Sequence, residues 1–161
     1  VCGYGSAAVE AGYMHALLWR KLQRRMGAEA KVRPVHLLGN QMIRAGAKRR
    51  NFGPGDVLTL NYLFQPEKDG PVLDLLAARS LIYAKLLEKE EIIGESGQFP
   101  HLKNEIETGR IADALDYNDC RRLYPLIRRS STAKARRIVL AYIERREGKR
   151  GSDDWLRGQV D

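Results

Sequence analysis

Residues 71–93 read PVLDLLAARSLIYAKLLEKEEII, and this stretch decides the fold class. Between Val72 and Leu87 the apolar residues leave almost no polar face, and Pro71 suits the first position of a helix. The pattern predicts a helix over residues 71–93 at the centre of the core. The charged residues 88–91 form its last turns, and Gly94 can end it.

Other segments also have helical periodicity, so we predict a mainly α, compact helical domain. Met14, Leu18, Leu22 and Met26 recur at helical spacing, which predicts a basic amphipathic helix over residues 6–28 that Ser6 can cap. Shorter helices are predicted over residues 40–50, 102–107, 110–115, 118–129 and 131–146. Pro125 should kink or divide the helix over residues 118–129.

Two segments have the composition of strands. Residues 31–38 and 55–64 contain weakly alternating apolar residues between turn residues. We therefore allow for a small two-stranded β element at residues 31–38 and 55–64. The chain reads as one domain over residues 1–161, with a soft boundary near residues 65–71.

The composition favours a polyanionic partner. Of the 161 residues 28 are Lys or Arg and 20 are Asp or Glu, which gives a net charge of +8, and 19 of the 28 are Arg. Arginine suits bidentate contacts to phosphate or carboxylate. No apolar run approaches the ~20 residues that span a bilayer, so no membrane insertion is predicted.

The charge is unevenly distributed along the chain. Residues 1–50 contain ten basic and two acidic residues, residues 51–119 contain six and thirteen, and residues 120–150 contain eleven and two. This order would allow two basic faces to converge on one side of the folded protein. Alternatively, each charged run is only the solvated side of its helix.

The basic clusters are the strongest functional signal. Arginine pairs with phosphates, and aromatic side chains can stack on exposed bases. The aromatic residues interleaved with these clusters are Tyr13, Trp19, Tyr117, Tyr124 and Tyr142. The candidate nucleic-acid-binding residues are Arg20, Lys21, Arg24, Arg25, Lys48, Arg49, Arg50, Arg121, Arg122, Arg128, Arg129, Arg136 and Arg137.

Residues 110–129 have the residue spacing of a helix-turn-helix motif. A short Ile-Ala-x-x-Leu helix would turn at Asp116 into a second helix, but the turn lacks the usual glycine and Pro125 interrupts the second helix. We favour two short helices of an α-bundle over a DNA-recognition motif.

Signatures of catalysis, metal binding and cofactor binding are weak. Residues 1–6 resemble the glycine turn of a dinucleotide site but lack its third glycine, and His15, His36 and His101 have no metal-ligand spacing. A metal-dependent nuclease could draw only on Asp56 with Glu88, Lys89 and Glu90. We therefore predict no cofactor and no metal, and we favour a protein without catalytic activity.

Cysteine usage suggests where the protein works. Cys2 and Cys120 are 118 residues apart, and nothing in the sequence brings them together. A reducing intracellular compartment (cytoplasm, nucleoid or organelle matrix) is the simpler interpretation. Since the sequence begins with Val, either a targeting peptide has been removed or the sequence starts inside a longer protein.

We expect a non-catalytic protein that grips nucleic acid through phosphates, with RNA or a ribonucleoprotein surface favoured over a specific DNA site. One alternative is a structural subunit of a large assembly, whose basic helices dock on acidic protein neighbours. Another is a metal-dependent nuclease. If the arginines of the first and last helices are to act as one footprint, folding must bring them to the same side of the protein, where they should be mostly exposed.

Overall fold

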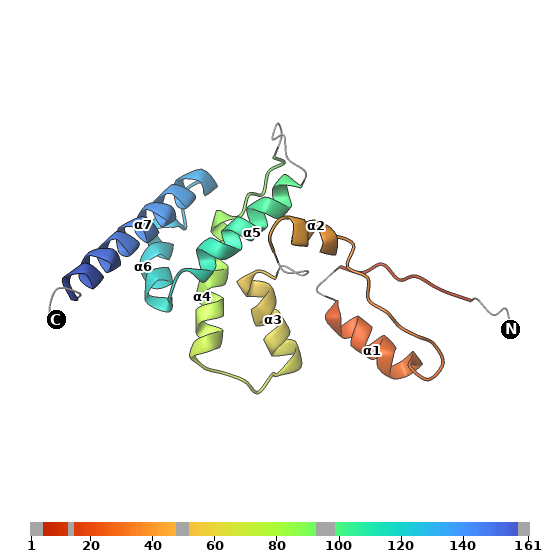
Figure 1. The fold of residues 1–161 in the computed structure, drawn as a ribbon. Helices are drawn as coiled ribbons and strands as arrows, with labels where there is room; N and C mark the ends of the chain where they lie inside the picture. The colour runs from red at the N-terminus through yellow and green to blue at the C-terminus, as the bar shows by residue number, and fades with distance from the viewer. Residues whose placement is uncertain (1–4, 13–14, 48–51, 93–98, 158–161) are drawn as a thin grey trace.

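The computed structural model describes residues 5–12, 15–47, 52–92 and 99–157, which form seven α-helices (Figure 1). The described residues contain no strand, so the prediction of a mainly α fold is confirmed, and the β element is not present. The helices are α1 (Ala16–Met26), α2 (Gly39–Arg44), α3 (Pro54–Phe64), α4 (Pro71–Leu86), α5 (Pro100–Asp113), α6 (Tyr117–Ile127) and α7 (Thr132–Arg157).

Helix α4 is the centre of the fold, as the sequence predicts. It packs against α3, α5, α6 and α7, and Ile82 and Leu86 are completely buried in the main apolar cluster. The helix ends at Leu86 rather than near residue 93, because Leu87 is extended and the backbone N–H of Glu88 donates to Asn104 Oδ1 at 3.0 Å. Side chains from α5, α6, α7 and the α5–α6 connection complete this core: Ile111, Leu115, Cys120, Leu123, Ile127, Ala135 and Val139.

The predicted strand over residues 55–64 is instead helix α3. Pro54 occupies its first turn, and Asp56 Oδ2 accepts a hydrogen bond from the backbone N–H of Gly53 at 2.9 Å. A Cβ atom on Gly53 would lie 3.0 Å from the Tyr83 ring, so any larger residue would require this ring to shift. The apolar residues of this segment fit both the strand and the helix periodicity, and the Gly53 and Pro54 start favours the helix.

The predicted strand over residues 31–38 is also wrong, because the described residues offer it no partner strand. The segment is irregular, and Val35 and Leu37 are exposed. Helix α1 is shorter than predicted: it begins at Ala16 after His15, and Ser6 does not cap it. The predicted short helix over residues 40–50 is α2, which ends at Arg44.

Helices α5, α6 and α7 close the other side of α4. α5 is one helix where the sequence suggested two, and Thr108 in its middle is buried. α6 runs through Pro125 without dividing, and this proline lies on the exposed side of the helix. α7 extends eleven residues beyond the predicted end at Arg146, to Arg157.

Helices α1 and α7 lie at opposite ends of the molecule (Figure 1). α1 touches the helical core where the Arg20 guanidinium lies 4.2 Å from the centre of the Phe64 ring. The segment after α2 is held by a hydrogen bond of 3.2 Å from Arg110 to the carbonyl oxygen of Gly46. None of the described helices is long and apolar enough to cross a membrane.

Candidate functional site

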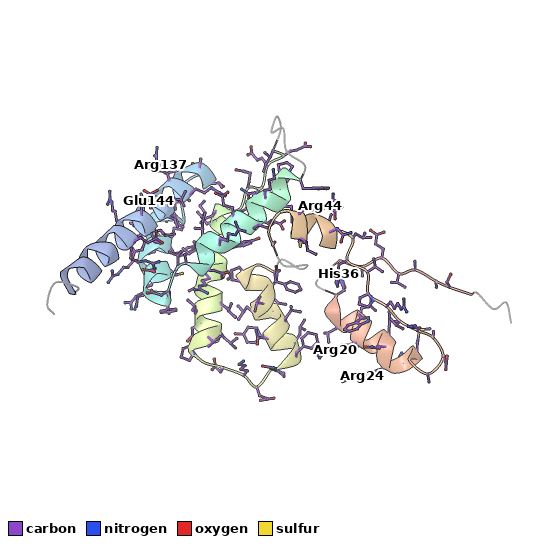
Figure 2. All side chains as sticks on the ribbon, viewed as in Figure 1. Arg20, Arg24, His36, Arg44, Arg137 and Glu144 are labelled. Carbon is purple, nitrogen blue, oxygen red and sulfur yellow. The ribbon has the colours of Figure 1, made fainter. Side chains whose placement is uncertain are left out.

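The structure divides the predicted basic residues between two separate surfaces. The α1 surface consists of Arg20, Lys21, Arg24 and Arg25, and all four are exposed. The α6–α7 surface consists of Arg121, Arg122, Arg128, Arg129, Lys134 and Arg137, and these are exposed as well. Figure 2 labels Arg20 and Arg24 at one end of the molecule and Arg137 at the other. The expected single footprint is therefore wrong. The third cluster, Lys48, Arg49 and Arg50, lies outside the described residues.

The α6–α7 surface is an unneutralised concentration of positive charge. Residues 117–148 contain nine Arg or Lys and three Asp or Glu. Within the described residues, none of the six members of this surface forms an ion pair, whereas the neighbouring Arg136 and Arg146 do. The acidic middle of the chain thus leaves these six cations available to an external anion.

The outer face of α6 presents two of these arginines together. Buried Cys120, Leu123 and Ile127 fix the inner face of the helix, so residues 117, 118, 121, 122, 125 and 126 point to solvent. Asn118, Arg121 and Arg122 line a hollow of about 300 Å³. Two guanidinium groups and one amide can all donate hydrogen bonds to an oxyanion, which is the chemistry that phosphate requires.

A buried polar network fixes α6 relative to α7. Asp116 and Asp119 form a capping box: Asp116 Oδ1 accepts from the Asp119 N–H at 2.8 Å, and Asp119 Oδ2 accepts from the Asp116 N–H at 3.0 Å. Asp119 also accepts a hydrogen bond of 2.6 Å from the Tyr142 hydroxyl and forms an ion pair with Arg146. Arg146 in turn donates to the carbonyl oxygen of Ala114 at 2.7 Å.

The electrostatics of this network follow from its hydrogen bonds. Burial acts to raise the pKa of the Asp119 carboxyl, but the hydrogen bonds from Tyr142 and the Asp116 backbone, together with the Arg146 charge, lower it below its ordinary value. The bond to Asp119 in turn raises the pKa of the Tyr142 hydroxyl. Asp119 therefore stays ionised, and its charge is neutralised internally by Arg146.

Arg136 was expected to be exposed, and this expectation is wrong. Its guanidinium forms an ion pair of 2.6 Å with Glu107 and donates to Thr108 Oγ1 at 3.2 Å and to the Leu86 carbonyl oxygen at 3.3 Å. Only 19% of its side chain is exposed. Arg136 links α7 to α4 and α5, so we remove it from the candidate site.

Among the interleaved aromatic residues, Tyr117 is the one that the structure leaves on the surface, with 49% of the residue exposed. Tyr124 and Tyr142 pack against the main core, and Trp19 is half-buried. Tyr13 lies outside the described residues. Two of the five predicted aromatic residues, Tyr124 and Tyr142, therefore belong to core packing rather than to a stacking surface.

The carboxylates of the middle third do not assemble a metal centre. In the part of the chain that the structure describes, no three His, Cys, Asp or Glu side chains are grouped to hold a metal ion, which argues against the Asp56, Glu88 and Glu90 set. Burial raises the pKa of the Glu105 carboxyl, and the nearby charge of Asp56 raises it further. Glu88 accepts hydrogen bonds from the backbone N–H groups of residues 89 and 90, which is a local turn contact. The glycine turn at residues 1–6 falls largely outside the described residues.

Cys120 belongs to the core and not to a reactive site. It is 2% exposed, is not part of a disulfide, and burial raises the pKa of its thiol to about 11. The other cysteine, Cys2, lies outside the described residues.

Sequence reasoning missed the Asp119 network, although part of its signal was visible. The three-residue spacing of Asp116 and Asp119 before an apolar helix is typical of a capping box. The contacts to Tyr142 and Arg146 span 23 and 27 residues, and only the packing of α7 on α6 brings them together.

Comparison with known proteins gives no function. An uncharacterized protein of Archaeoglobus fulgidus is 35% identical to this chain over 119 residues, which cover 73% of the chain. The chain spans only 40% of the length of that relative. No protein-family profile matches the chain, and no solved structure matches it significantly.

Proposed function

We propose that this protein is a non-catalytic nucleic-acid-binding protein that grips phosphates through its α6–α7 surface, with RNA or a ribonucleoprotein surface as its partner. One observation carries the proposal: six exposed cations on adjacent segments have no carboxylate partner among the described residues. Surfaces of this kind attract the phosphate backbone and release its counterions.

Several further features support a phosphate grip over base-specific DNA recognition. Asn118, Arg121 and Arg122 converge on one hollow, and Asn118 adds a neutral donor to their charge. The helix-turn-helix interpretation stays unfavoured because the turn between α5 and α6 lacks the usual glycine and Pro125 lies inside the second helix. Phosphate contacts position a nucleic acid without reading its sequence.

Fluorescence anisotropy with a labelled RNA of arbitrary sequence tests the proposal. Binding should weaken steeply between about 50 and 200 mM salt and depend little on the base sequence. The variant Arg128→Glu with Arg137→Glu should lose most of the affinity. For a single strand the slope of log affinity against log salt should fall by roughly 1.4, which is about 0.7 for each lost phosphate contact.

A matched control carries the same change of charge elsewhere. Arg33 and Arg44 are exposed and belong to neither basic surface, so Arg33→Glu with Arg44→Glu should leave most of the affinity intact. Equal losses in both double variants would show that net charge, not the α6–α7 surface, controls binding. A wild-type protein that binds no oligonucleotide at low salt would reject the proposal in favour of a subunit that docks on acidic proteins.

The α1 surface is tested in the same assay. Arg24→Glu with Arg25→Glu changes the charge by the same amount at the other end of the molecule. A loss of affinity comparable with that of the α6–α7 variant would mean that both ends contact the nucleic acid. Retained affinity would confine the binding site to the α6–α7 surface.

A further inference from the structure

The outer face of α6 combines an exposed aromatic ring with two arginines. Tyr117 and Arg121 are four residues apart, as are Asn118 and Arg122, so the two pairs form adjacent rows along one helix face. Tyr117 is 49% exposed, and Arg121 and Arg122 line the hollow beside it. An exposed aromatic residue thus lies on the same helix face as the three residues that line the hollow, one position before Asn118 and four before Arg121.

The Tyr117 ring is open to a ligand. The described residues contain one pairing of a cation with an aromatic ring, that of Arg20 with Phe64, so no guanidinium covers Tyr117. Tyr117 is also absent from the apolar cluster that fixes Tyr124 and Tyr142. The exposed part of the Tyr117 side chain is therefore accessible to a contact outside the chain.

The acidic side chains near this face are already occupied. Asp119 is paired with Arg146 and bonded to Tyr142, and Asp113 lies 3.6 Å from Arg79. Asp116 accepts the hydrogen bond of the Asp119 backbone N–H. No ion pair joins Arg121 or Arg122 to a carboxylate among the described residues, and Arg122 lies beside Tyr142, where its charge acts to lower the pKa of the Tyr142 hydroxyl.

From this arrangement we infer that α6 recognises single-stranded nucleic acid: one unpaired base stacks on Tyr117 while the neighbouring phosphate lies in the hollow between Asn118, Arg121 and Arg122. The inference rests on the proposed function and deepens it. In a duplex the faces of the bases are covered by their neighbours, so the ring has nothing to stack on. In a single strand every base offers a face, and the contact tolerates any sequence.

Anisotropy titrations with three probes test the inference: an oligouridine of roughly 12 nucleotides, a duplex RNA of the same length, and an abasic oligomer with the same phosphates. Tyr117→Ala should weaken binding of the oligouridine about tenfold and binding of the duplex and the abasic oligomer less than twofold. Tyr117→Phe keeps the ring and should bind as the parent does.

Tyr62→Ala is the matched control. Tyr62 lies on α3 with 54% of the residue exposed, and residues 54–64 contain no Lys or Arg. This variant should bind all three probes as the parent does. Unchanged circular dichroism and melting temperature would show that Tyr117→Ala is folded, as expected for an exposed residue in the first turn of α6.

The outcomes separate this inference from the proposed function. If the parent binds the probes with steep salt dependence but Tyr117→Ala has no effect, or weakens all three equally, the stacking inference is overturned and the phosphate grip stands. A parent that binds none of the probes overturns both. Tighter binding of the abasic oligomer than of the oligouridine would also overturn the stacking inference.

Discussion

Replacing Asp119 by alanine should strongly destabilise the α6–α7 side of the protein, because one carboxylate bonds three groups on α6 and α7. The Asp119 carboxylate accepts hydrogen bonds from the backbone N–H of Asp116 at the start of α6, from the hydroxyl of Tyr142 on α7, and from the guanidinium of Arg146, which is also on α7. Asp119 is 5% exposed, so water cannot replace these partners without opening the structure.

The size of the effect follows from the groups left behind. Arg146 keeps its hydrogen bond to the Ala114 carbonyl oxygen but loses its counter-charge, with 20% of its side chain exposed. Removing one partner of a buried ion pair costs about 3–5 kcal/mol, and a lost hydrogen bond to a charged group about 1.5–3 kcal/mol. Since these contributions overlap, we expect a total loss of about 3–5 kcal/mol.

Urea denaturation followed by circular dichroism measures this loss. Asp116→Ala is the internal control, because it removes the other half of the capping box at an exposed position and should cost only about 0.5–2 kcal/mol. If Asp119→Ala unfolds within about 1 kcal/mol of the parent, or no lower than Asp116→Ala, the network does not hold α6 to α7 as described.

Three further predictions concern the core, acid stability and the internal arginine. Ile82→Ala should lower the free energy of unfolding by about 2–5 kcal/mol, because Ile82 is completely buried. Leu81 is 49% exposed, so Leu81→Ala should cost under about 1 kcal/mol. Similar melting temperatures for the two variants would contradict the central position of α4. Folding lowers the pKa of the Asp119 carboxyl. The ionised group therefore contributes its full stabilisation of the folded protein above the ordinary carboxyl pKa of ~3.9, and this stabilisation is lost as the pH falls through the pKa of the folded state. Urea midpoints should therefore fall more steeply below about pH 4 in the parent than in Asp119→Asn, and parallel curves would refute this. Arg136→Glu should destabilise by about 1–3 kcal/mol in thermal melts while Arg137→Glu stays within about 0.5 kcal/mol, and the reverse order would show that the two arginines have exchanged roles.

The elements that the sequence predicts well are those whose own residues settle their conformation. The apolar run after Pro71 is continuous, so α4 and its central position need no information from elsewhere in the chain. The two strand predictions failed for different reasons. Residues 55–64 fit both periodicities, and the Gly53 and Pro54 start selects the helix. Residues 31–38 could form a strand only with a partner, which the described residues do not supply.

The candidate site was predictable by residue type but not by position. Arginines form solvated faces and internal ion pairs equally well, so residue type does not tell which of them stays in solvent; helical periodicity places Arg136 at the edge of the apolar stripe of α7 and Arg137 opposite it. The partners of Arg136, Glu107 on α5 and Leu86 on α4, come from the packing of the helices, whereas Arg137 stays in solvent. The distance between α1 and α7 likewise depends on the whole arrangement of helices, and no local pattern encodes it.

The slender attachment of α1 has a consequence for amide hydrogen exchange. α4 and α6 share the main core, so their amides should exchange only through global unfolding, whereas α1 is joined to the core by the contact of Arg20 with Phe64 and can open locally at lower free energy. A nucleic acid held at the α1 surface would slow exchange throughout that helix. One held at the α6–α7 surface would leave the protection of α1 unchanged, so the exchange pattern itself reports which end of the molecule is occupied.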